Sequence, residues 1–309
     1  MKGVTKTLLS HSHQVAKSAK AQSILICADA FTDPEELIEL TEGKGTEIKI
    51  VRAGGPWPKA EDGDLDIDLP SIGLTRMGQV KLAVLVSISR GVLKQNDTIV
   101  CVAGLTGSGI LDTMVVLDLA KEFEMFNTNP ATITEAVDEA VFERVLEIAG
   151  RLAREGREGR PVGTTFVLGD SDAVSKHVQQ MILNPLEGHP RKRRNIMDMA
   201  LDETIRELSA LDGAFIVDRE GILLSAGTYL DAPAQGVDLR QGLGARHYSA
   251  AAITKATKAV AIAVSESSGG LTVFKSGTVL IEIEKPTERR KQTSARLPQS
   301  PPAKPSKGT

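Results

Sequence analysis

The chain has 309 residues, of which 41% are apolar and 25% charged, and its formal net charge is −3. This length is enough for two ordinary domains, and the composition is that of a soluble globular protein. The small net charge argues against nucleic acid or a membrane surface as a partner. No apolar run approaches the roughly 20 residues that span a bilayer. The sequence therefore predicts a cytoplasmic protein that binds neither a membrane nor nucleic acid.

Cysteine and histidine usage fits this interpretation. Cys27 and Cys101 lie within apolar runs and are interpreted as buried free thiols, which suits a reducing compartment. His11 and His13 could bind a metal, but two histidines without further ligands are more often surface residues. Residues 1–20 are predicted to be a polar lead-in without the apolar core of a signal peptide.

Strand-like and helix-like segments alternate from residue 21 onward, which is typical of a parallel α/β sheet. Asp33 precedes Pro34 and is predicted to cap a helix. A loop rich in Pro, Gly and Asp is predicted over 55–70. The remaining elements expected in this half are strands at 23–30, 47–54 and 96–104 and helices at 77–93, 110–123 and 133–159.

The second half has a different pattern, in which several short strands lie beside a few helices. Helices are predicted at 171–182 and 199–211. This predicts a mixed sheet packed by helices. The fold class is therefore α/β, with an N-terminal parallel α/β domain over 21–155 and a mixed-sheet α/β domain over 156–285. The tail over 286–309 has six basic residues and one acidic residue, and is predicted to be disordered.

Two motifs could contact phosphate but also have plain structural interpretations. GLTGSG at 104–109 follows a predicted strand, where backbone N–H groups could cradle a phosphate, although a tight turn is the commoner outcome. It matches neither the dinucleotide-binding nor the Walker pattern. The run Arg191–Arg194 could meet phosphate or nucleic acid, but a solvated loop is favoured because the rest of the chain is acidic.

Two further motifs could surround a nucleotide. A predicted helix runs into Asp212, Gly213 and Ala214 just before a strand. Glycine lets a ligand approach the backbone closely, and a carboxylate can hold Mg²⁺ or poise a hydroxyl, although a helix-to-strand turn explains this motif equally well. The segment 222–230 is predicted to end a strand in a turn of small residues, followed by Tyr229 and Leu230. It could admit and pack a flat ring, but hairpins share this pattern.

Arg246 and His247 follow a Gly-x-Gly turn and open an alanine-rich helical pattern. A guanidinium suits phosphate oxygens, histidine adds a donor or metal ligand, and a helix start adds free N–H groups. The strand at 259–266 delivers Ser265 and Glu266 at its end, where open sheets bind ligands. A surface Arg-His pair and a polar strand end are the alternatives when each motif is taken alone.

In order, the motifs DGA, GTYL, GxGARH and VSE, together with RNI at 194–196, resemble the diadenylate cyclase domain over residues 160–285. The arrangement of a preceding α/β domain and a C-terminal cyclase domain is similar to the archaeal form. It has neither the transmembrane helices of the membrane-bound bacterial type nor the helix–hairpin–helix domain of the DNA-scanning type. The first domain resembles the effector-binding C-terminal domain of pyruvate kinases, which implies a regulatory or oligomerising module.

The resemblance implies that two ATP molecules condense to cyclic di-AMP and two pyrophosphates in the presence of Mn²⁺ or Mg²⁺. Each subunit of a homo-oligomer would hold one ATP, with two active sites face to face. The resemblance implies catalytic roles for Asp212, Arg246 and His247, and metal ligands in Asp212, His247 and Glu266. The implied nucleotide-binding residues are Gly213, Ala214, Thr228, Tyr229, Leu230, Gly244, Arg246, His247, Ser265 and Glu266.

One departure from the family pattern leaves alternatives open. Many members read Thr-Arg-His-Arg where this chain has Ala245, Arg246, His247 and Tyr248, so a hydroxyl and a positive charge are missing. A non-catalytic sensor of ATP or cyclic di-AMP on the same fold is the first alternative. The second is a metabolite-binding α/β protein in which the first half carries the function.

Overall fold

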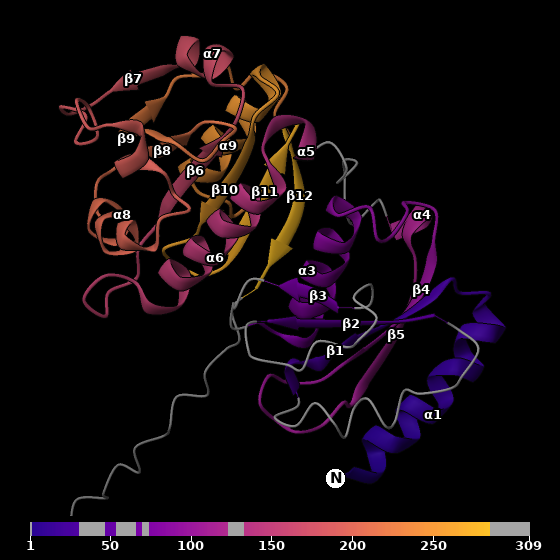
Figure 1. The fold of residues 1–309 in the computed structure, drawn as a ribbon. Helices are drawn as coiled ribbons and strands as arrows, with labels where there is room; N and C mark the ends of the chain where they lie inside the picture. Colours follow the sequence, from indigo (N-terminus) through magenta and orange to yellow (C-terminus); the bar gives the residue numbers. More distant parts are fainter. Residues whose placement is uncertain (1, 31–46, 54–65, 70–73, 123–132, 285–309) are drawn as a thin grey trace, which may run out of the picture.

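The computed structural model describes residues 2–30, 47–53, 66–69, 74–122 and 133–284. They form two α/β domains, each built around one sheet (Figure 1). The helix start predicted at Asp33 and the disordered tail predicted over 286–309 lie outside the described residues.

The predicted polar lead-in is helical and forms α1 (Lys2–Ala19), which packs against β1, β4 and β5. Its buried positions are Thr5, Leu9, Ser12 and Ala16, one face of a helix. Two of the four are hydroxyl residues, so the buried face of this helix does not show as a row of apolar residues in the sequence. Their hydroxyls are satisfied locally: that of Thr5 accepts from the N–H of Leu111 at 3.1 Å, and that of Ser12 donates to the Leu9 carbonyl at 2.7 Å.

The first sheet has the strand order β3-β2-β1-β4-β5. β1 to β4 run parallel, as predicted, but β5 runs antiparallel to β4. Two predictions are wrong here: the 55–70 loop contains β3, and most of the 110–123 helix is instead β5 followed by the short helix α4 (Leu119–Glu122). The strands are β1 (Ser23–Cys27), β2 (Glu47–Ala53), β3 (Asp66–Leu69), β4 (Thr98–Ala103) and β5 (Thr113–Asp118).

The glycine loop at 104–109 closes against the end of β1 by backbone hydrogen bonds. The N–H groups of Gly107 and Gly109 donate to the carbonyls of Asp29 and Ala30 at 2.9 and 2.6 Å. The N–H of Ser108 donates to the Leu105 carbonyl at 2.9 Å. Because these donors are already used, the tight-turn interpretation is favoured over the phosphate cradle.

The second sheet has seven strands in the order β12-β11-β10-β6-β8-β9-β7. Only β6 and β8 run parallel to each other, so the prediction of a mixed sheet is confirmed. The strands are β6 (Thr164–Leu168), β7 (Val178–Gln180), β8 (Ala214–Val217), β9 (Leu223–Leu230), β10 (Val260–Val264), β11 (Leu271–Lys275) and β12 (Thr278–Ile283).

Three predicted helices are broken or shorter in the structure. The 133–159 segment divides into α5 (Ile133–Ala136) and α6 (Glu139–Glu155), and α6 packs on β10 and β11 of the second sheet although the sequence places it in the first domain. The 171–182 segment contains the one-turn helix α7 (Ser171–Val174) and then β7, so the predicted helix is wrong over its second half. The 199–211 segment is a 3₁₀ turn followed by α8 (Asp202–Leu208).

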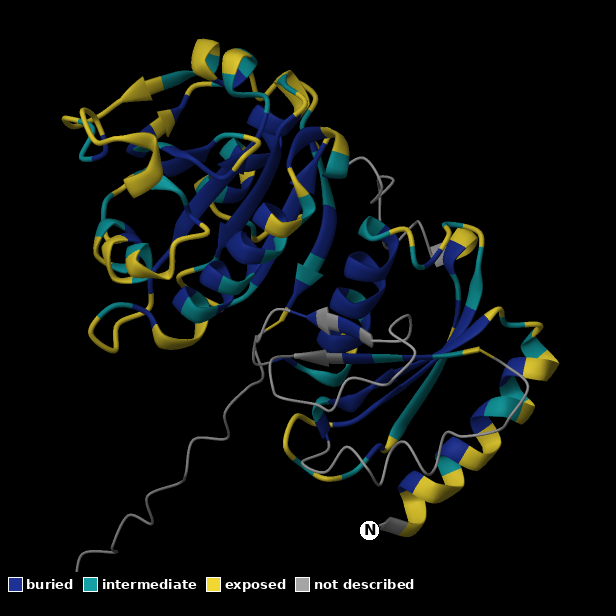
Figure 2. Ribbon diagram, in the orientation of Figure 1, coloured by how far each residue is buried: buried dark blue, intermediate teal, exposed yellow. Residues whose placement is uncertain are grey.

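Helices cover the second sheet on both sides, with α9 (Ala245–Ala256) against β6, β10, β11 and β12, and α6 against β10 and β11. The central strands are dark blue along their length in Figure 2 because both of their faces are buried. Phe166 of β6 and Phe215 of β8 stack with ring centroids 4.9 Å apart. This rigid centre fixes the ends of β6, β8 and β10, where the candidate site lies.

The two domains meet through α3 (Arg76–Ser89), which contacts β12 of the second sheet. α3 begins at Thr75, whose hydroxyl accepts from the N–H of Gly78 at 3.0 Å. Just beyond its other end, Arg90 pairs with Glu139 at 3.0 Å and with Glu143 at 2.8 Å, both on α6. One cluster of buried apolar residues therefore extends from the first domain into the second.

Candidate functional site

Three adjacent strands bring the predicted site residues to one edge of the second sheet. β6 lies between β8, which runs parallel to it, and β10, which runs antiparallel. The residues just before β8 and those just after β10 therefore lie side by side. They are Asp212 and Gly213 on one side, and Ser265 and Glu266 on the other. The N-terminus of α9, capped by Gly244, lines the same cavity.

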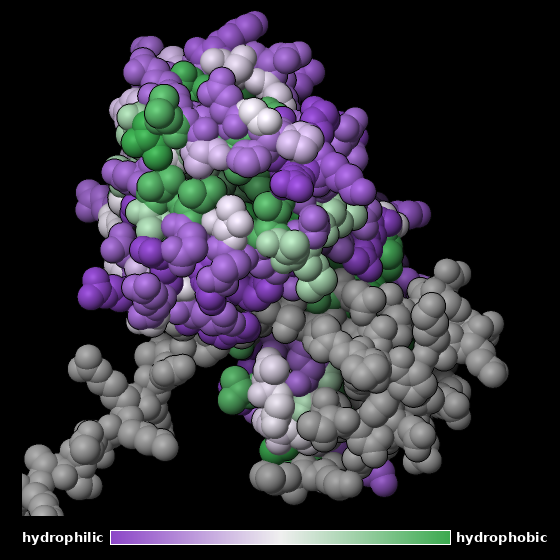
Figure 3. All heavy atoms as spheres, turned by 60° about the vertical axis from the view of Figure 1, so that its left-hand side comes forward, coloured by the Kyte–Doolittle hydropathy of each residue, from purple (hydrophilic) through white to green (hydrophobic). Residues whose placement is uncertain are grey.

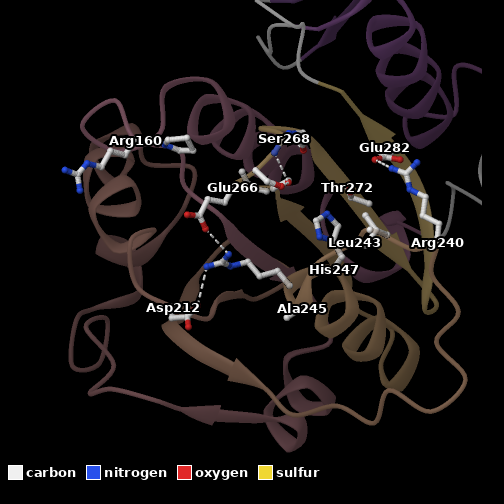
Figure 4. A pocket seen from close by; sticks show the side chains of 18 residues that line it. Arg160, Asp212, Arg240, Leu243, Ala245, His247, Glu266, Ser268, Thr272 and Glu282 are labelled. Carbon is white, nitrogen blue, oxygen red and sulfur yellow. Dashed lines mark hydrogen bonds and ion pairs between the residues drawn. The ribbon is translucent and has the colours of Figure 1, made fainter.

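Arg246, in the first turn of α9, pairs with the carboxylates of Asp212 and Glu266, which are labelled in Figure 4. Its Nη2 is 3.3 Å from Oδ1 of Asp212, and its Nη1 is 3.3 Å from Oε2 of Glu266. The side chains of Arg246, Glu266 and Asp212 are 37%, 60% and 85% exposed. Long, exposed ion pairs of this kind contribute little stability, so the Arg246 N–H groups can be given up to a phosphate ligand at little cost.

Two cavities meet at this pair, and both are lined by Asp212, Ala245 and Arg246. The larger cavity, of about 1090 Å³, is otherwise lined mainly by polar and charged residues and by the Gly-x-Gly turn. The smaller, of about 240 Å³, is lined by Gly213, Ala214, Thr228, Tyr229 and Leu230, among others. An elongated ligand with a charged end and a flat, less polar end matches this pair of cavities.

His247 lines the larger cavity and is mostly buried. Its ring lies edge-on to that of Phe274, with centroids 6.0 Å apart. Burial lowers the pKa of His247, and the nearby Arg240 and Arg246 lower it further, while Glu282 opposes them. The imidazole is therefore neutral at neutral pH, the form that can bind a metal or share a proton with an anion.

Gly213 is required by the backbone at this place. Its φ is +106°, and a Cβ there would lie 2.7 Å from both the N and the O of Thr228 on the neighbouring strand β9. The turn before β8 can approach β9 this closely only without a side chain. Gly213 therefore fixes the position of the backbone at Asp212, the residue that precedes it.

Gly213→Ala is expected to lower the free energy of unfolding by roughly 2–4 kcal/mol, because the new Cβ meets backbone atoms that cannot move aside. Denaturant unfolding followed by circular dichroism measures this loss. The matched control is Gly242→Ala, since Gly242 has a similar φ of +98° but open space around its Cβ position. Equal losses in both variants would show that backbone strain, and not the close approach to β9, explains the requirement.

The three residues predicted to contact adenosine have different surroundings. Thr228 is buried, and its hydroxyl donates to Oε1 of Gln180 at 3.2 Å and lies 2.7 Å from the Ser225 hydroxyl. Leu230 is also buried, whereas Tyr229 is 52% exposed at the cavity wall. All three belong to β9, so the predicted turn before Tyr229 is strand.

The three predicted metal ligands do not form one group. Within the described parts of the chain, no cluster of three or more His, Cys, Asp or Glu side chains is placed to hold a metal. Arg246 lies between Asp212 and Glu266, and His247 lies on the larger cavity only. The two exposed carboxylates, Asp212 and Glu266, line the larger cavity. They nonetheless fit Mg²⁺, which proteins bind through one or two carboxylates plus substrate phosphates.

Sequence reasoning missed several cavity residues. On the larger cavity, Arg240 pairs with Glu282 near His247, and on the smaller one Met181 follows the unpredicted strand β7. Only the pairing of β11 with β12 and of β7 with β9 places these residues at the site. Further missed lining residues are Arg160, Ser249, Ser268 and Thr272.

The other residues singled out in the sequence have structural roles. Arg191 pairs with Asp218 at 3.0 Å and with Glu220 at 3.1 Å, and Arg194 donates to the Leu223 carbonyl at 2.9 Å. These contacts favour the loop interpretation of the basic run. Cys27 and Cys101 are buried and free, and burial raises the pKa of both thiols, that of Cys101 to about 12.

Both domains match known family models. Residues 151–279 match the model described as "DisA bacterial checkpoint controller nucleotide-binding". Residues 5–126 match the model described as "Probable sensor domain DacZ_P". Among the residues that the structure describes, no helix is long and apolar enough to cross a membrane.

Solved structures with some likeness have low scores. A hypothetical membrane spanning protein from Bacillus cereus has a TM-score of 0.34 at 19% identity and covers 54% of this chain and 71% of its own. DacA from Staphylococcus aureus has a TM-score of 0.31 at 20% identity, covering 46% and 85%. A pyruvate kinase from Cryptosporidium parvum has a TM-score of 0.26 at 10% identity, covering 37% and 22%. At these scores no common fold is established, and the predicted likeness of the first domain to pyruvate kinases is not confirmed.

Two curated relatives carry the name diadenylate cyclase. The one from Methanocaldococcus jannaschii is 38% identical over 200 residues, and the alignment spans 62% of this chain and 62% of the relative's length. The one from Haloferax volcanii is 32% identical over 223 residues, spanning 71% of this chain and 79% of the relative. Together with the match over the nucleotide-binding region, these relatives show that the chain belongs to the diadenylate cyclase family.

Proposed function

We propose that this protein condenses two ATP molecules into cyclic di-AMP with release of two pyrophosphates. The observation that carries the proposal is that Asp212 and Arg246, 34 positions apart, meet at 3.3 Å on the wall shared by two cavities. The nucleoside would occupy the smaller cavity and the polyphosphate the larger one. The α-phosphorus would then lie at the junction, beside the carboxylate and the guanidinium.

In the proposed reaction, the 3′-oxygen of each ATP forms a bond to the α-phosphorus of the other. At each α-phosphorus the bond to the bridging oxygen breaks, so two pyrophosphates leave. Asp212, an exposed carboxylate, accepts the hydroxyl proton. The N–H groups of Arg246 that bond Asp212 and Glu266 would instead donate to phosphoryl oxygens and stabilise their charge. Positioning and charge stabilisation provide most of the catalysis in phosphoryl transfer.

The remaining site residues would bind ATP. Gly213 and Ala214 let the nucleoside lie against the backbone, and Thr228, Tyr229 and Leu230 of the neighbouring strand β9 also line the smaller cavity. On the polyphosphate side, Gly244 opens α9, whose first N–H groups favour an anion. Neutral His247 and the hydroxyl of Ser265 face the same cavity.

Mn²⁺ or Mg²⁺ is proposed as the cofactor. Asp212 and Glu266 would hold the cation together with phosphate oxygens, and His247 is the third proposed ligand because its imidazole is neutral. The cation would neutralise part of the polyphosphate charge. Arg246, which pairs with both carboxylates, would bind phosphate oxygens of the same nucleotide.

A homo-oligomer with facing sites is also proposed, because the proposed site of each chain would hold one ATP and the reaction needs two nucleotides. Exposed apolar side chains flank the smaller cavity: Met181 and Tyr229 line it, and Ile182 and the 95% exposed Leu183 adjoin Met181. Figure 3 shows apolar residues gathered among polar ones on this domain. Exposed apolar patches of this kind are typical of protein interfaces.

Two further proposals concern the role of the first domain and the cellular location of the protein. The first domain is proposed to regulate the second, as its match to a sensor-domain model suggests, and the likeness to the effector domain of pyruvate kinases is kept as a hypothesis. A cytoplasmic location is proposed because both cysteines are buried free thiols.

The test is a product assay with the purified full-length chain, ATP and either Mn²⁺ or Mg²⁺. Cyclic di-AMP and pyrophosphate are expected in a one-to-two ratio, measured by liquid chromatography and mass spectrometry. ATP binding without any product would support the sensor alternative. Failure to bind ATP would favour a function located in the first domain.

A further inference from the structure

Gly163 occupies the centre of the candidate site, although it lines neither cavity. It immediately precedes β6, where Thr165 pairs with Ala214 of β8 and Thr164 pairs with Val264 of β10. Continuing both registers toward the strand end places Gly163 between Asp212 and Ser265. The residue thus lies on the middle strand of the three that form the site.

The space above Gly163 is filled by Arg246. A Cβ at this position would lie 2.7 Å from Nη1 of Arg246, 3.2 Å from its Cζ and 2.9 Å from Cβ of Glu266. The φ of Gly163 lies outside the left-handed region, so the backbone itself admits other residues. Glycine is therefore needed here for space, because the guanidinium rests directly on the backbone of β6.

The buried side of the guanidinium supports the same conclusion. Nε of Arg246 is buried without a hydrogen-bond partner, while Nη1 and Nη2 reach Glu266 and Asp212. The two carboxylates bind the guanidinium from two sides, and the backbone of Gly163 lies directly under it. A side chain at 163 would displace the guanidinium from this position.

We propose that Gly163 is a positioning residue that sets the depth of the Arg246 guanidinium, and through it the place of the reacting phosphate. The inference rests on the proposed function for its kinetic consequence only. The displacement of Arg246 can be observed whether or not the protein makes cyclic di-AMP.

Gly163→Ala is expected to lower kcat/KM for cyclic di-AMP formation by about 10²-fold, the effect of a small misplacement of a catalytic group. The melting temperature should fall only modestly, because Nη1 of Arg246 is the far end of a flexible side chain, although Cβ of Glu266 has to shift as well. Gly3→Ala is the matched control: nothing lies within 4 Å of its Cβ position, and its φ is not left-handed.

A double-mutant cycle separates positioning from a structural role. Arg246→Lys keeps a positive charge but has no Nη1. Only the contact with Cβ of Glu266 remains in that background, so Gly163→Ala should cost far less there, about twofold. The inference is overturned if Gly163→Ala reduces activity by the same factor in both backgrounds. It is also overturned if Gly163→Ala alone is as active as the wild type.

Crystal structures of the wild type and of Gly163→Ala provide the readout that does not depend on activity. The guanidinium of Arg246 is expected to move by about 1 Å to restore normal contact distances, with the backbone of β6 in place. A guanidinium that stays while β6 moves would overturn the inference. If the wild type makes no cyclic di-AMP, the proposed function fails, and this structural comparison still decides the role of Gly163.

Discussion

Asp212→Asn is expected to reduce kcat for cyclic di-AMP formation by about 10²–10⁴-fold, the usual contribution of a general base. The amide has almost the same shape and keeps Oδ1, which lies 3.3 Å from Arg246, so the cavities should be unchanged. It cannot accept the proton of the attacking hydroxyl and is a poor ligand for a cation. The rate of product formation at saturating ATP measures the effect, and calorimetry is expected to show that ATP still binds.

Asp172→Asn is the matched control for this variant, because it makes the same change at an exposed aspartate of α7 that lines neither cavity. Its rate is expected to lie within about twofold of the wild type, as surface substitutions usually have small effects. A rate for Asp212→Asn equal to that of Asp172→Asn would remove Asp212 from the mechanism. The proposed function would then lose the observation on which it rests.

Arg246→Ala is expected to lower kcat/KM by about 10³-fold, because it removes the main preorganised donor for the reacting phosphate. The melting temperature should change little, since the two ion pairs that are lost are long and exposed. Thermal denaturation and steady-state kinetics on the same preparation measure both quantities.

Arg144→Ala is a control in which a loss of stability is expected. Arg144 is only 8% exposed and pairs with Asp202 at 2.5 Å while donating to the Ile196 carbonyl at 3.2 Å. Removing one partner of such a buried pair costs about 3–5 kcal/mol, so this variant should be clearly destabilised. A comparable loss of stability in Arg246→Ala would identify Arg246 as a structural residue.

The motifs that predict the candidate site are distant along the chain. The structure brings Asp212, Arg246 and Glu266 of these motifs together at the start of β8, the start of α9 and the end of β10. Gly163 could not be identified in this way. A glycine before a strand gives no indication of function in the sequence. Its role follows only from the position of Arg246 above it.

The errors in both domains have a common cause, which is that a local pattern does not contain the tertiary partner of the segment. Residues 110–123 have apolar spacing compatible with a helix, yet pairing with β4 makes 113–118 a strand. Thr5 and Ser12 belong to the buried face of α1 but are polar, so the apolar pattern of the sequence does not predict this helix. β7 has only three residues and exists because β9 pairs with it.

The shared apolar cluster between α3 and β12 has a thermodynamic consequence. Leu82 and Leu85 of α3 belong to the same buried cluster as Ile281 of β12, and Arg90 ties the end of α3 to α6. Neither half can lose its packing without exposing apolar surface of the other, so heat should melt both in one cooperative transition. A ligand that binds either half would consequently raise the melting temperature of both.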